Sequence, residues 1–268
     1  MDLKEKRELL ESIAITAKKA GDAILVVYDS DFDVEKKGDQ SLLTEADKQS
    51  HIVIQRDLEK TAYPILSEEG RAIPYEERSA WDILWIVDPL DGTKEFVKRN
   101  GEFTVNIALI ENGETVLGAI YVPVKDQMYL GAKGFGSAKI EEFSKQTDKN
   151  LEAWFADSNK LPLSFNRKYT IVGSRSHMSP ETELFIEEKR KEQGDLEMIS
   201  VGSSLKLCMV AEGRADAYPR FAPTMEWDTA AGQAIVESMG GEVIDWTTKE
   251  KMRYNRENLL NNWFLVSH

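Results

Sequence analysis

The sequence has little cysteine and no long hydrophobic run, and each shortage excludes a class of protein. Its one cysteine, Cys208, cannot form a disulfide within the chain and predicts a reducing compartment, the cytoplasm. No apolar run approaches the roughly 20 residues of a membrane-spanning helix, so we expect no membrane span. Residues 1–11 are rich in charge and predict a helix, not a secretory signal. Peripheral contact with the inner membrane face stays open.

Basic side chains are also in the minority. The 268 residues contain 34 Lys and Arg against 47 Asp and Glu, a formal net charge of -13. This balance argues against a nucleic acid polymer as partner, because such a partner needs a basic surface. It would also repel an anionic substrate unless metal ions and a few local cations reverse the sign inside a cleft. Solubility explains most of the acidic charge, but not its clustering at the ends of predicted strands.

The first half of the chain predicts two helices followed by a series of strands. Hydrophobic residues at helical spacing predict a helix over residues 3–29 and a second over about 44–60. Residues 31–43 are expected to form a hairpin or loop, and residues 71–81 a loop. The strands expected in this half are residues 63–66, 83–87, 103–110, 115–122, 127–132 and 137–140.

The second half alternates strands and helices. The polar segment 141–160 predicts a boundary between an α+β domain over residues 1–150 and a smaller α/β domain over residues 151–268. The strands expected here are residues 170–174, 197–200, 215–218, 241–245 and 263–266, and the helices are residues 180–193, 203–212 and 228–239.

The most informative segment is D-P-L-D-G-T-K-E-F, residues 88–96, which directly follows the apolar run 83–87. Asp88 and Asp91 lie where the predicted strand ends and a glycine-containing turn begins. Paired carboxylates in such a place suit a hard divalent cation, because Mg²⁺ takes oxygen ligands and keeps positions for water or phosphate. Backbone N–H groups at Gly92 and the following residue could hold a phosphate.

Further acidic residues occupy similar places, and each alone has a structural explanation. Asp47 and Asp228 could be helix-start carboxylates that face the helix dipole, and Glu68 and Glu69 could form a solvated turn. Together, several carboxylates at strand ends would repel one another unless a cation lay between them. Two cations roughly 3.5 to 4 Å apart form the clamp used for in-line phosphoryl displacement. The joint pattern therefore favours a metal-dependent phosphatase.

A related phosphatase pattern does not fit. Haloacid-dehalogenase phosphatases carry D-x-D-G-T, in which the first aspartate is the nucleophile. Here Pro89 stands two residues before Asp91, so that nucleophile is lacking. We therefore expect water, and not an aspartate, to attack the phosphate.

With these motifs the chain resembles the inositol monophosphatase superfamily of metal-dependent phosphatases, and within it the 3'(2'),5'-bisphosphate nucleotidases. The similar segments cover nearly the whole chain; besides residues 88–96 they are 37–47 (K-G-D-Q-S-L-L-T-E-A-D), 67–70 (S-E-E-G), 100–110, 173–177 and 202–234. The resemblance implies a layered sandwich with alternating α-β-α-β-α layers, in which a larger antiparallel sheet domain meets a smaller α/β domain.

The resemblance also implies a reaction. The protein would use two or three Mg²⁺ and metal-activated water to remove the 3'-phosphate from adenosine 3',5'-bisphosphate, yielding AMP and phosphate, and Li⁺ would inhibit it. The partner would be this small nucleotide, and the protein a monomer or homodimer. Two alternatives stay open. One is an inositol or sugar monophosphatase of the same superfamily, and the other is a non-catalytic protein that binds metal or nucleotide.

Residue roles follow from the resemblance position by position. The catalytic set would be Thr93, which orients the attacking water, with Asp47 or Glu69 behind it. The metal ligands would be Glu69, Asp88, the carbonyl of Leu90, Asp91 and Asp228. The substrate would contact several of these, together with Gly92, Ser174, His177, Gly202, Ser203, Lys206 and Arg220. From the residues alone, His177 could equally be a loop histidine with a local hydrogen bond, and Lys206 a solvated helix residue.

Overall fold

Two β-sheets form the framework of the protein. The computed structural model describes residues 1–268 except 31–33, 37–41, 149 and 174–178. The six-stranded sheet has the order β3-β4-β5-β6-β7-β8 and is antiparallel except for the parallel pair β3 and β4. Its strands are β3 (Ile65–Ser67), β4 (Ile83–Asp91), β5 (Thr104–Glu111), β6 (Glu114–Val122), β7 (Gln127–Ala132) and β8 (Gly136–Ile140).

The second sheet is smaller and mixed. Its order is β10-β9-β11-β13-β12, with parallel pairing from β10 to β11 and antiparallel pairing beyond. The strands are β9 (Tyr169–Gly173), β10 (Leu196–Ser200), β11 (Ala217–Arg220), β12 (Glu242–Asp245) and β13 (Phe264–Ser267).

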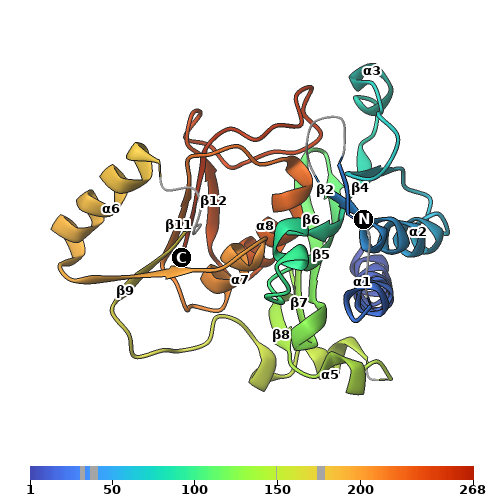
Figure 1. The fold of residues 1–268 in the computed structure, drawn as a ribbon, viewed down its shortest axis with the longest axis horizontal. Helices are drawn as coiled ribbons and strands as arrows, with labels where there is room; N and C mark the ends of the chain where they lie inside the picture. Colours follow the sequence, from blue (N-terminus) through green and yellow to red (C-terminus); the bar gives the residue numbers. More distant parts are fainter. Residues whose placement is uncertain (31–33, 37–41, 149, 174–178) are drawn as a thin grey trace.

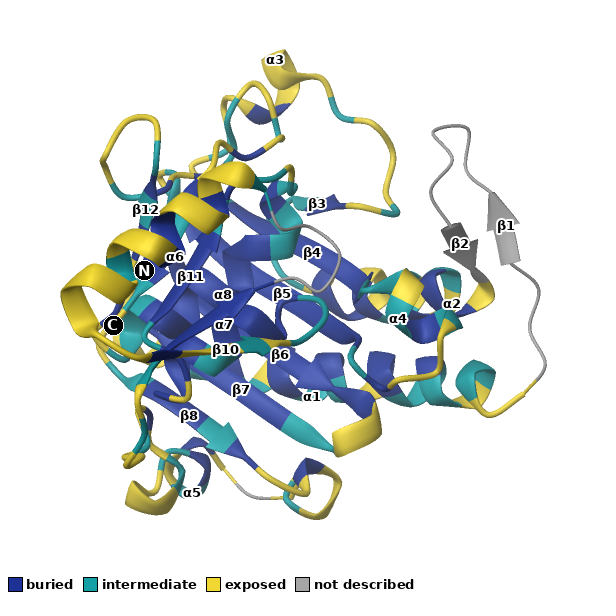
Figure 2. Cartoon of the chain, turned by 60° about the vertical axis from the view of Figure 1, so that its left-hand side comes forward, coloured by how far each residue is buried: buried dark blue, intermediate teal, exposed yellow. Residues whose placement is uncertain are grey.

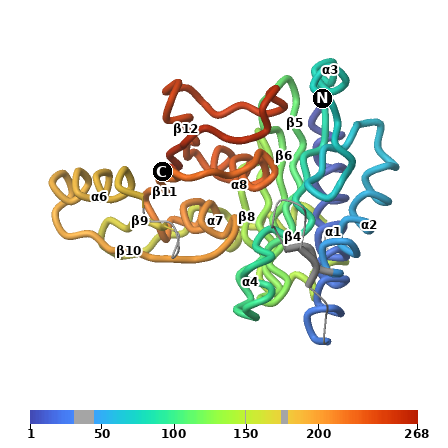
Figure 3. Tube along the Cα trace, turned by 45° about the horizontal axis from the view of Figure 1, so that its top comes forward, coloured from blue at the N-terminus to red at the C-terminus, as the bar shows by residue number. Residues whose placement is uncertain are grey.

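Helices cover both sheets and produce five layers. In Figure 1, α1 (Leu3–Tyr28) and α2 (Glu45–Leu58) cover the outer face of the six-stranded sheet, and α6 (Pro180–Gln193) covers the outer face of the second. Between the sheets lie α7 (Leu205–Ala211) and α8 (Glu226–Ser238), and Figure 3 shows the same succession from another side. The α-β-α-β-α layering that the resemblance implied is confirmed.

Burial on both faces explains the unbroken apolar run of β4. Trp85 and Val87 belong to the core beneath α1, whereas Leu84 and Ile86 belong to the core between the sheets. A strand that is covered on both sides has no solvent face, so its sequence reads as a continuous hydrophobic run. Figure 2 shows this buried centre in dark blue.

Helix α8 lies unusually close to the six-stranded sheet. A Cβ atom at Gly131 would lie 2.4 Å from the Cα atom of Ile235, and one at Gly118 would lie 2.6 Å from the carbonyl oxygen of Ala231. Both glycines therefore allow the helix backbone to rest directly on the strands. This contact fixes the height of α8, whose first turn carries Asp228, above the sheet.

The structure differs from the predicted elements in a few places. Strand β4 continues to Asp91 and does not end at residue 87. Residues 71–81 contain a short helix, α3 (Tyr75–Arg78). The hairpin expected at residues 31–43 agrees with the antiparallel pair β1 (Val34–Lys36) and β2 (Leu42–Thr44). The other short helices are α4 (Thr93–Val97), α5 (Leu151–Trp154), η1 (Pro123–Lys125), η2 (Phe143–Lys145) and η3 (Asp157–Asn159).

The core between the sheets draws on both halves of the chain. It contains Leu84 and Ala108 from the first half and Leu205 and Ala230 from the second. The division near residue 150 stays a prediction. Over the described part of the chain, no helix has the length and hydropathy to cross a membrane.

Candidate metal centre

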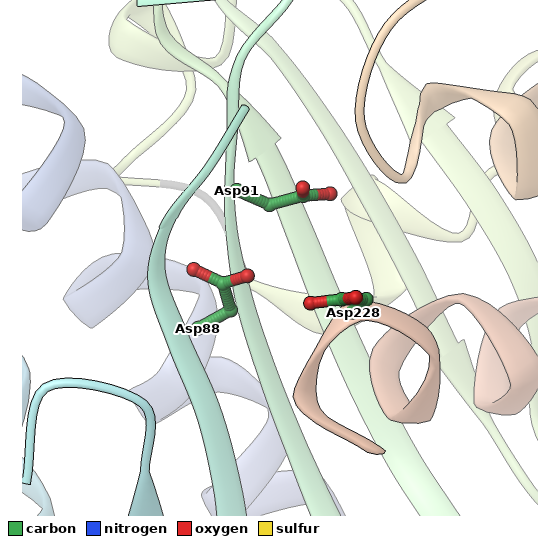
Figure 4. A group of neighbouring side chains, drawn as sticks. All are labelled: Asp88, Asp91 and Asp228. Atoms are coloured by element: carbon green, nitrogen blue, oxygen red, sulfur yellow. The ribbon is translucent and has the colours of Figure 1, made fainter. Parts of the chain in front are cut away.

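An irregularity in strand β4 brings two aspartates to the same face of the sheet. Asp88 pairs with Asn106 of β5 and Asp91 pairs with Thr104, so three steps along β4 oppose two steps along β5. In a regular strand, residues three apart face opposite sides, and one extra residue restores the same side. Pro89 lies inside the irregular stretch, where its missing N–H costs no ladder hydrogen bond. Figure 4 shows the carboxylates of Asp88 and Asp91 near that of Asp228.

Backbone groups hold one oxygen of each aspartate. The Oδ1 atom of Asp88 accepts a hydrogen bond from the backbone N–H of Leu90 at 3.1 Å. Asp91 accepts one from the backbone N–H of Ser204. The Oδ2 atom of Asp228 accepts one from the backbone N–H of Met225, the residue before α8, at 2.9 Å. Each carboxylate is thus oriented by the main chain.

The three carboxylates lie close enough to disturb one another's ionisation. One oxygen from each of Asp88, Asp91 and Asp228 lies within 4.8 Å of the others. Burial raises the pKa of Asp88 well above its usual range, and the charges of Glu68, Asp91 and Asp228 raise it further. Burial, and then the charge of Asp91, raise the pKa of Asp228 to about 8. An all-oxygen, acidic donor set of this kind fits a hard divalent cation, which would remove the repulsion.

Asp47 and Thr93 meet beside this cluster. The Oγ1 atom of Thr93 donates a hydrogen bond to Oδ1 of Asp47 at 3.4 Å. Asp47 is buried in the first turn of α2, and its charge contributes to the raised pKa of Asp88. Ser50, one turn further along α2, donates its hydroxyl to the carbonyl oxygen of Pro89 at 2.6 Å. Helix α2 is therefore tied to the irregular stretch of β4.

Of the two neighbouring glutamates, Glu68 is the one whose charge acts on the aspartates. Its backbone N–H donates to the carbonyl oxygen of Val87, and its charge raises the pKa of both Asp88 and Asp228. Glu68 itself is exposed. Sequence reasoning had offered Glu68 only as part of a strand-end pair and gave the ligand role to Glu69.

Glu69 instead lines a separate cavity of about 730 Å³, together with His51, Ser67 and Arg71. Burial lowers the pKa of His51, and the charge of Glu69 opposes that shift. Glu69 is thus found at this separate cavity, and its role as a metal ligand stays a prediction. Neighbouring side chains after a strand end point in different directions, so the motif alone does not say which of the two glutamates serves the metal.

A second cavity, of about 240 Å³, extends from the aspartates toward the second sheet. Asp91, Gly92 and Asp228 line it at the metal centre. Four of the predicted substrate contacts line it as well: Gly202, Ser203, Lys206 and Arg220. Ser174 and His177 lie outside the described residues.

Lys206 is the buried cation of this cavity. Its Nζ donates to the carbonyl oxygen of Ser203 at 2.5 Å, and only 8% of the residue is exposed. Burial lowers the pKa of Lys206 to about 8, although the charge of Asp91 opposes the shift. Lys206 therefore remains mostly charged at neutral pH, and the alternative of a solvated helix residue is wrong.

The raised carboxyl pKa values predict how stability depends on pH. Without metal, folded Asp228 holds its proton up to about pH 8, whereas the unfolded chain releases it near pH 4. The native state thus binds more protons between these limits, and stability falls as pH rises through them, by roughly 1.4 kcal/mol per pH unit for one group. We expect metal-free protein to melt several degrees lower at pH 8 than at pH 6. Differential scanning calorimetry should show a smaller slope for Asp228→Asn and for protein in saturating Mg²⁺; equal slopes in all three would contradict the repulsive site.

Comparison with known proteins gives a consistent result. The model of the inositol monophosphatase family matches residues 5–266. The 3'(2'),5'-bisphosphate nucleotidase CysQ of Escherichia coli K12 is 42% identical over 266 residues, which cover 97% of this chain and 99% of that protein. The crystal structure of CysQ from Bacteroides thetaiotaomicron, a bacterial member of the inositol monophosphatase family, is 46% identical, with a TM-score of 0.85 and 97% of each chain covered. An IMPase from Thermotoga maritima is 26% identical with a TM-score of 0.72, over 97% of this chain and 92% of that one.

Proposed function

The chain belongs to the inositol monophosphatase family, and from this membership we propose that it is a Mg²⁺-dependent phosphatase that removes the 3'-phosphate of adenosine 3',5'-bisphosphate. It is an enzyme of the 3'(2'),5'-bisphosphate nucleotidase type, as its relatives with 42 to 46% identity are named. The observation that carries the proposal is the convergence of Asp88, Asp91 and Asp228 at one end of the 240 Å³ cavity. The products are AMP and inorganic phosphate.

Two or three Mg²⁺ would be held mainly by these aspartates. We assign Glu68 and the carbonyl oxygen of Leu90 to complete the ligand set, because Glu68 acts on Asp88 and Leu90 lies between the two aspartates of β4. When bound, the metal lowers the pKa of a water molecule and stabilises the charge on the oxygens of the phosphoryl group. This set contains oxygen donors alone, as Mg²⁺ requires.

The remaining residues orient the reactants. Oγ1 of Thr93 donates a hydrogen bond to Asp47, so its lone pairs can accept a hydrogen bond from the attacking water. As that water gives up its proton to Thr93, Thr93 would pass its own proton to the Asp47 carboxylate. Gly92 has a φ of 95°, a conformation that favours glycine, and its lack of a side chain lets the phosphate approach the backbone. No covalent enzyme intermediate is needed, because water is the nucleophile.

The far end of the cavity would bind the rest of the nucleotide. Lys206 and Arg220 line it, and we assign them to the 5'-phosphate because they supply positive charge in a strongly acidic protein. Gly202 and Ser203 would contact the sugar, and Ser174 and His177 stay predicted contacts. Specificity for a second phosphate would therefore come from the second half of the chain.

A phosphate-release panel tests this function. We expect kcat/KM for adenosine 3',5'-bisphosphate to exceed that for adenosine 3'-monophosphate, inositol 1-phosphate and fructose bisphosphate by at least about tenfold, as one desolvated charge pair can provide. Release should require Mg²⁺. Faster turnover of the inositol compound would replace the substrate assignment, and binding of the nucleotide without release would indicate a non-catalytic protein.

A further inference from the structure

A buried polar network connects the metal centre to helix α7. Strand β5 places Asn106 opposite Asp88 and Thr104 opposite Asp91, and neither is more than 1% exposed. Ser204, which precedes α7 and is 2% exposed, fits against these two side chains. Its hydroxyl lies 2.8 Å from Oγ1 of Thr104 and donates to Oδ1 of Asn106 at 2.9 Å.

Ser204 acts on Asp91 in two ways. Its backbone N–H donates directly to the Asp91 carboxylate. Its hydroxyl engages the carbonyl end of the Asn106 amide, which fixes the direction of the amino end. The Nδ2 atom of Asn106 has no hydrogen-bond partner among the described residues. A buried donor is thus left unpaired next to the residue that holds Asp91, and such an atom calls for an explanation.

We propose that Ser204 and Asn106 are positioning residues that fix the Asp91 carboxylate in the orientation that binds the divalent cation, so that the Ser204 hydroxyl sets the affinity for Mg²⁺. The inference rests on the proposed function only in taking a divalent cation as the ligand of the cluster. Partners behind metal ligands commonly change metal affinity by about 10- to 100-fold, because they remove the freedom of the ligand to rotate. Since Ser204 lies just before α7 and Asp91 lies at the end of β4, the contact of Ser204 with β4 and β5 becomes part of the metal site.

The test removes the hydroxyl but keeps the backbone N–H. For Ser204→Ala we expect the Kd for Mg²⁺ to rise about tenfold or more, measured by isothermal titration calorimetry on the full chain without substrate. The Mg²⁺ concentration for half-maximal phosphate release should shift in parallel, whereas KM for the nucleotide at saturating Mg²⁺ should not. Ser204→Thr retains a hydroxyl and should bind Mg²⁺ within about threefold of the unmodified protein.

A matched control separates positioning from general stability. Ser137 is 2% exposed, and its hydroxyl donates to the carbonyl oxygen of Ile235, at a place in the six-stranded sheet that does not line the metal cavity. Ser137→Ala should lower the melting temperature and leave the Mg²⁺ affinity unchanged. If Ser204→Ala does not fold, Asn106→Ala replaces it, with circular dichroism as the check.

The outcomes are distinct. The inference is overturned if Ser204→Ala, or its replacement Asn106→Ala, binds Mg²⁺ with unchanged affinity. It is also overturned if Ser137→Ala loses as much Mg²⁺ affinity as Ser204→Ala. Either result leaves the proposed function standing. A protein that binds Mg²⁺ with the expected difference but releases no phosphate supports the inference and overturns the function. A protein that binds no Mg²⁺ overturns both.

Discussion

Asp88→Asn is expected to lower kcat/KM by more than about 100-fold, beyond the usual cost of losing a partner behind a metal ligand. Asp88 is the most central of the carboxylates, because the charges of Glu68, Asp91, Asp228 and Asp47 all act on it. Asparagine keeps an oxygen that can accept the hydrogen bond from Leu90, so the irregular turn should survive. It removes one negative charge from a group that repels itself without metal, so metal-free protein should become no less stable. Steady-state kinetics and thermal melting with and without Mg²⁺ measure both effects.

Asp57→Asn provides the opposite pattern as a control. Asp57 is also buried, at the end of α2, but Lys19 and Lys60 lie at 3.1 and 2.6 Å from its oxygens. Burial alone would raise the pKa of Asp57, but hydrogen bonds from Lys60 and Lys19 outweigh this effect and lower the pKa to about 2. Asp57→Asn should therefore cost stability at neutral pH and leave turnover within about twofold. A large loss of activity in Asp57→Asn, or near-normal activity in Asp88→Asn, would contradict the assignment of the metal centre.

The fold could be predicted in some detail because most of its signals are local. The apolar spacing of α1 and the continuous run in β4 reflect burial that each segment experiences along its whole length. The small helix α3 was not predicted, because four residues are too few to show the helical spacing of hydrophobic residues. The extension of β4 to Asp91 escaped because it depends on pairing with β5, which lies more than ten residues further along the chain.

The metal centre could be predicted in part. Asp88 and Asp91 share one short motif, and the structure brings Asp228 to them from α8. What the sequence did not indicate is the support behind Asp91: Ser204 and Asn106 are small polar residues without a distinctive pattern, and their meeting depends on the packing of two distant elements. Similarly, Lys206 could be read as solvated until the cavity around it was known.

Separate substitution of each of the two glutamates after β3 by glutamine tests which of them binds the metal. Glu68→Gln should raise the Mg²⁺ concentration for half-maximal turnover by about tenfold or more, because it removes a charge that acts on Asp88 and Asp228. Glu69→Gln should leave turnover within about twofold, since Glu69 lines the cavity around His51. The two variants are matched controls, because each makes the same chemical change at adjacent positions and alters the net charge equally.

Glu69→Gln should also change the pKa of His51, which serves as a positive control for the substitution. The charge of Glu69 raises the pKa of His51 against the lowering by burial, so its removal should lower that pKa further, as NMR titration of the imidazole would show. A shift at His51 together with intact Mg²⁺ dependence places Glu69 outside the metal centre. If instead Glu69→Gln weakens the Mg²⁺ response and Glu68→Gln does not, the ligand assignment drawn from the family resemblance holds. The charge of Glu68 would then act on the aspartates without binding the metal, since a ligand must bring its own oxygen to the ion.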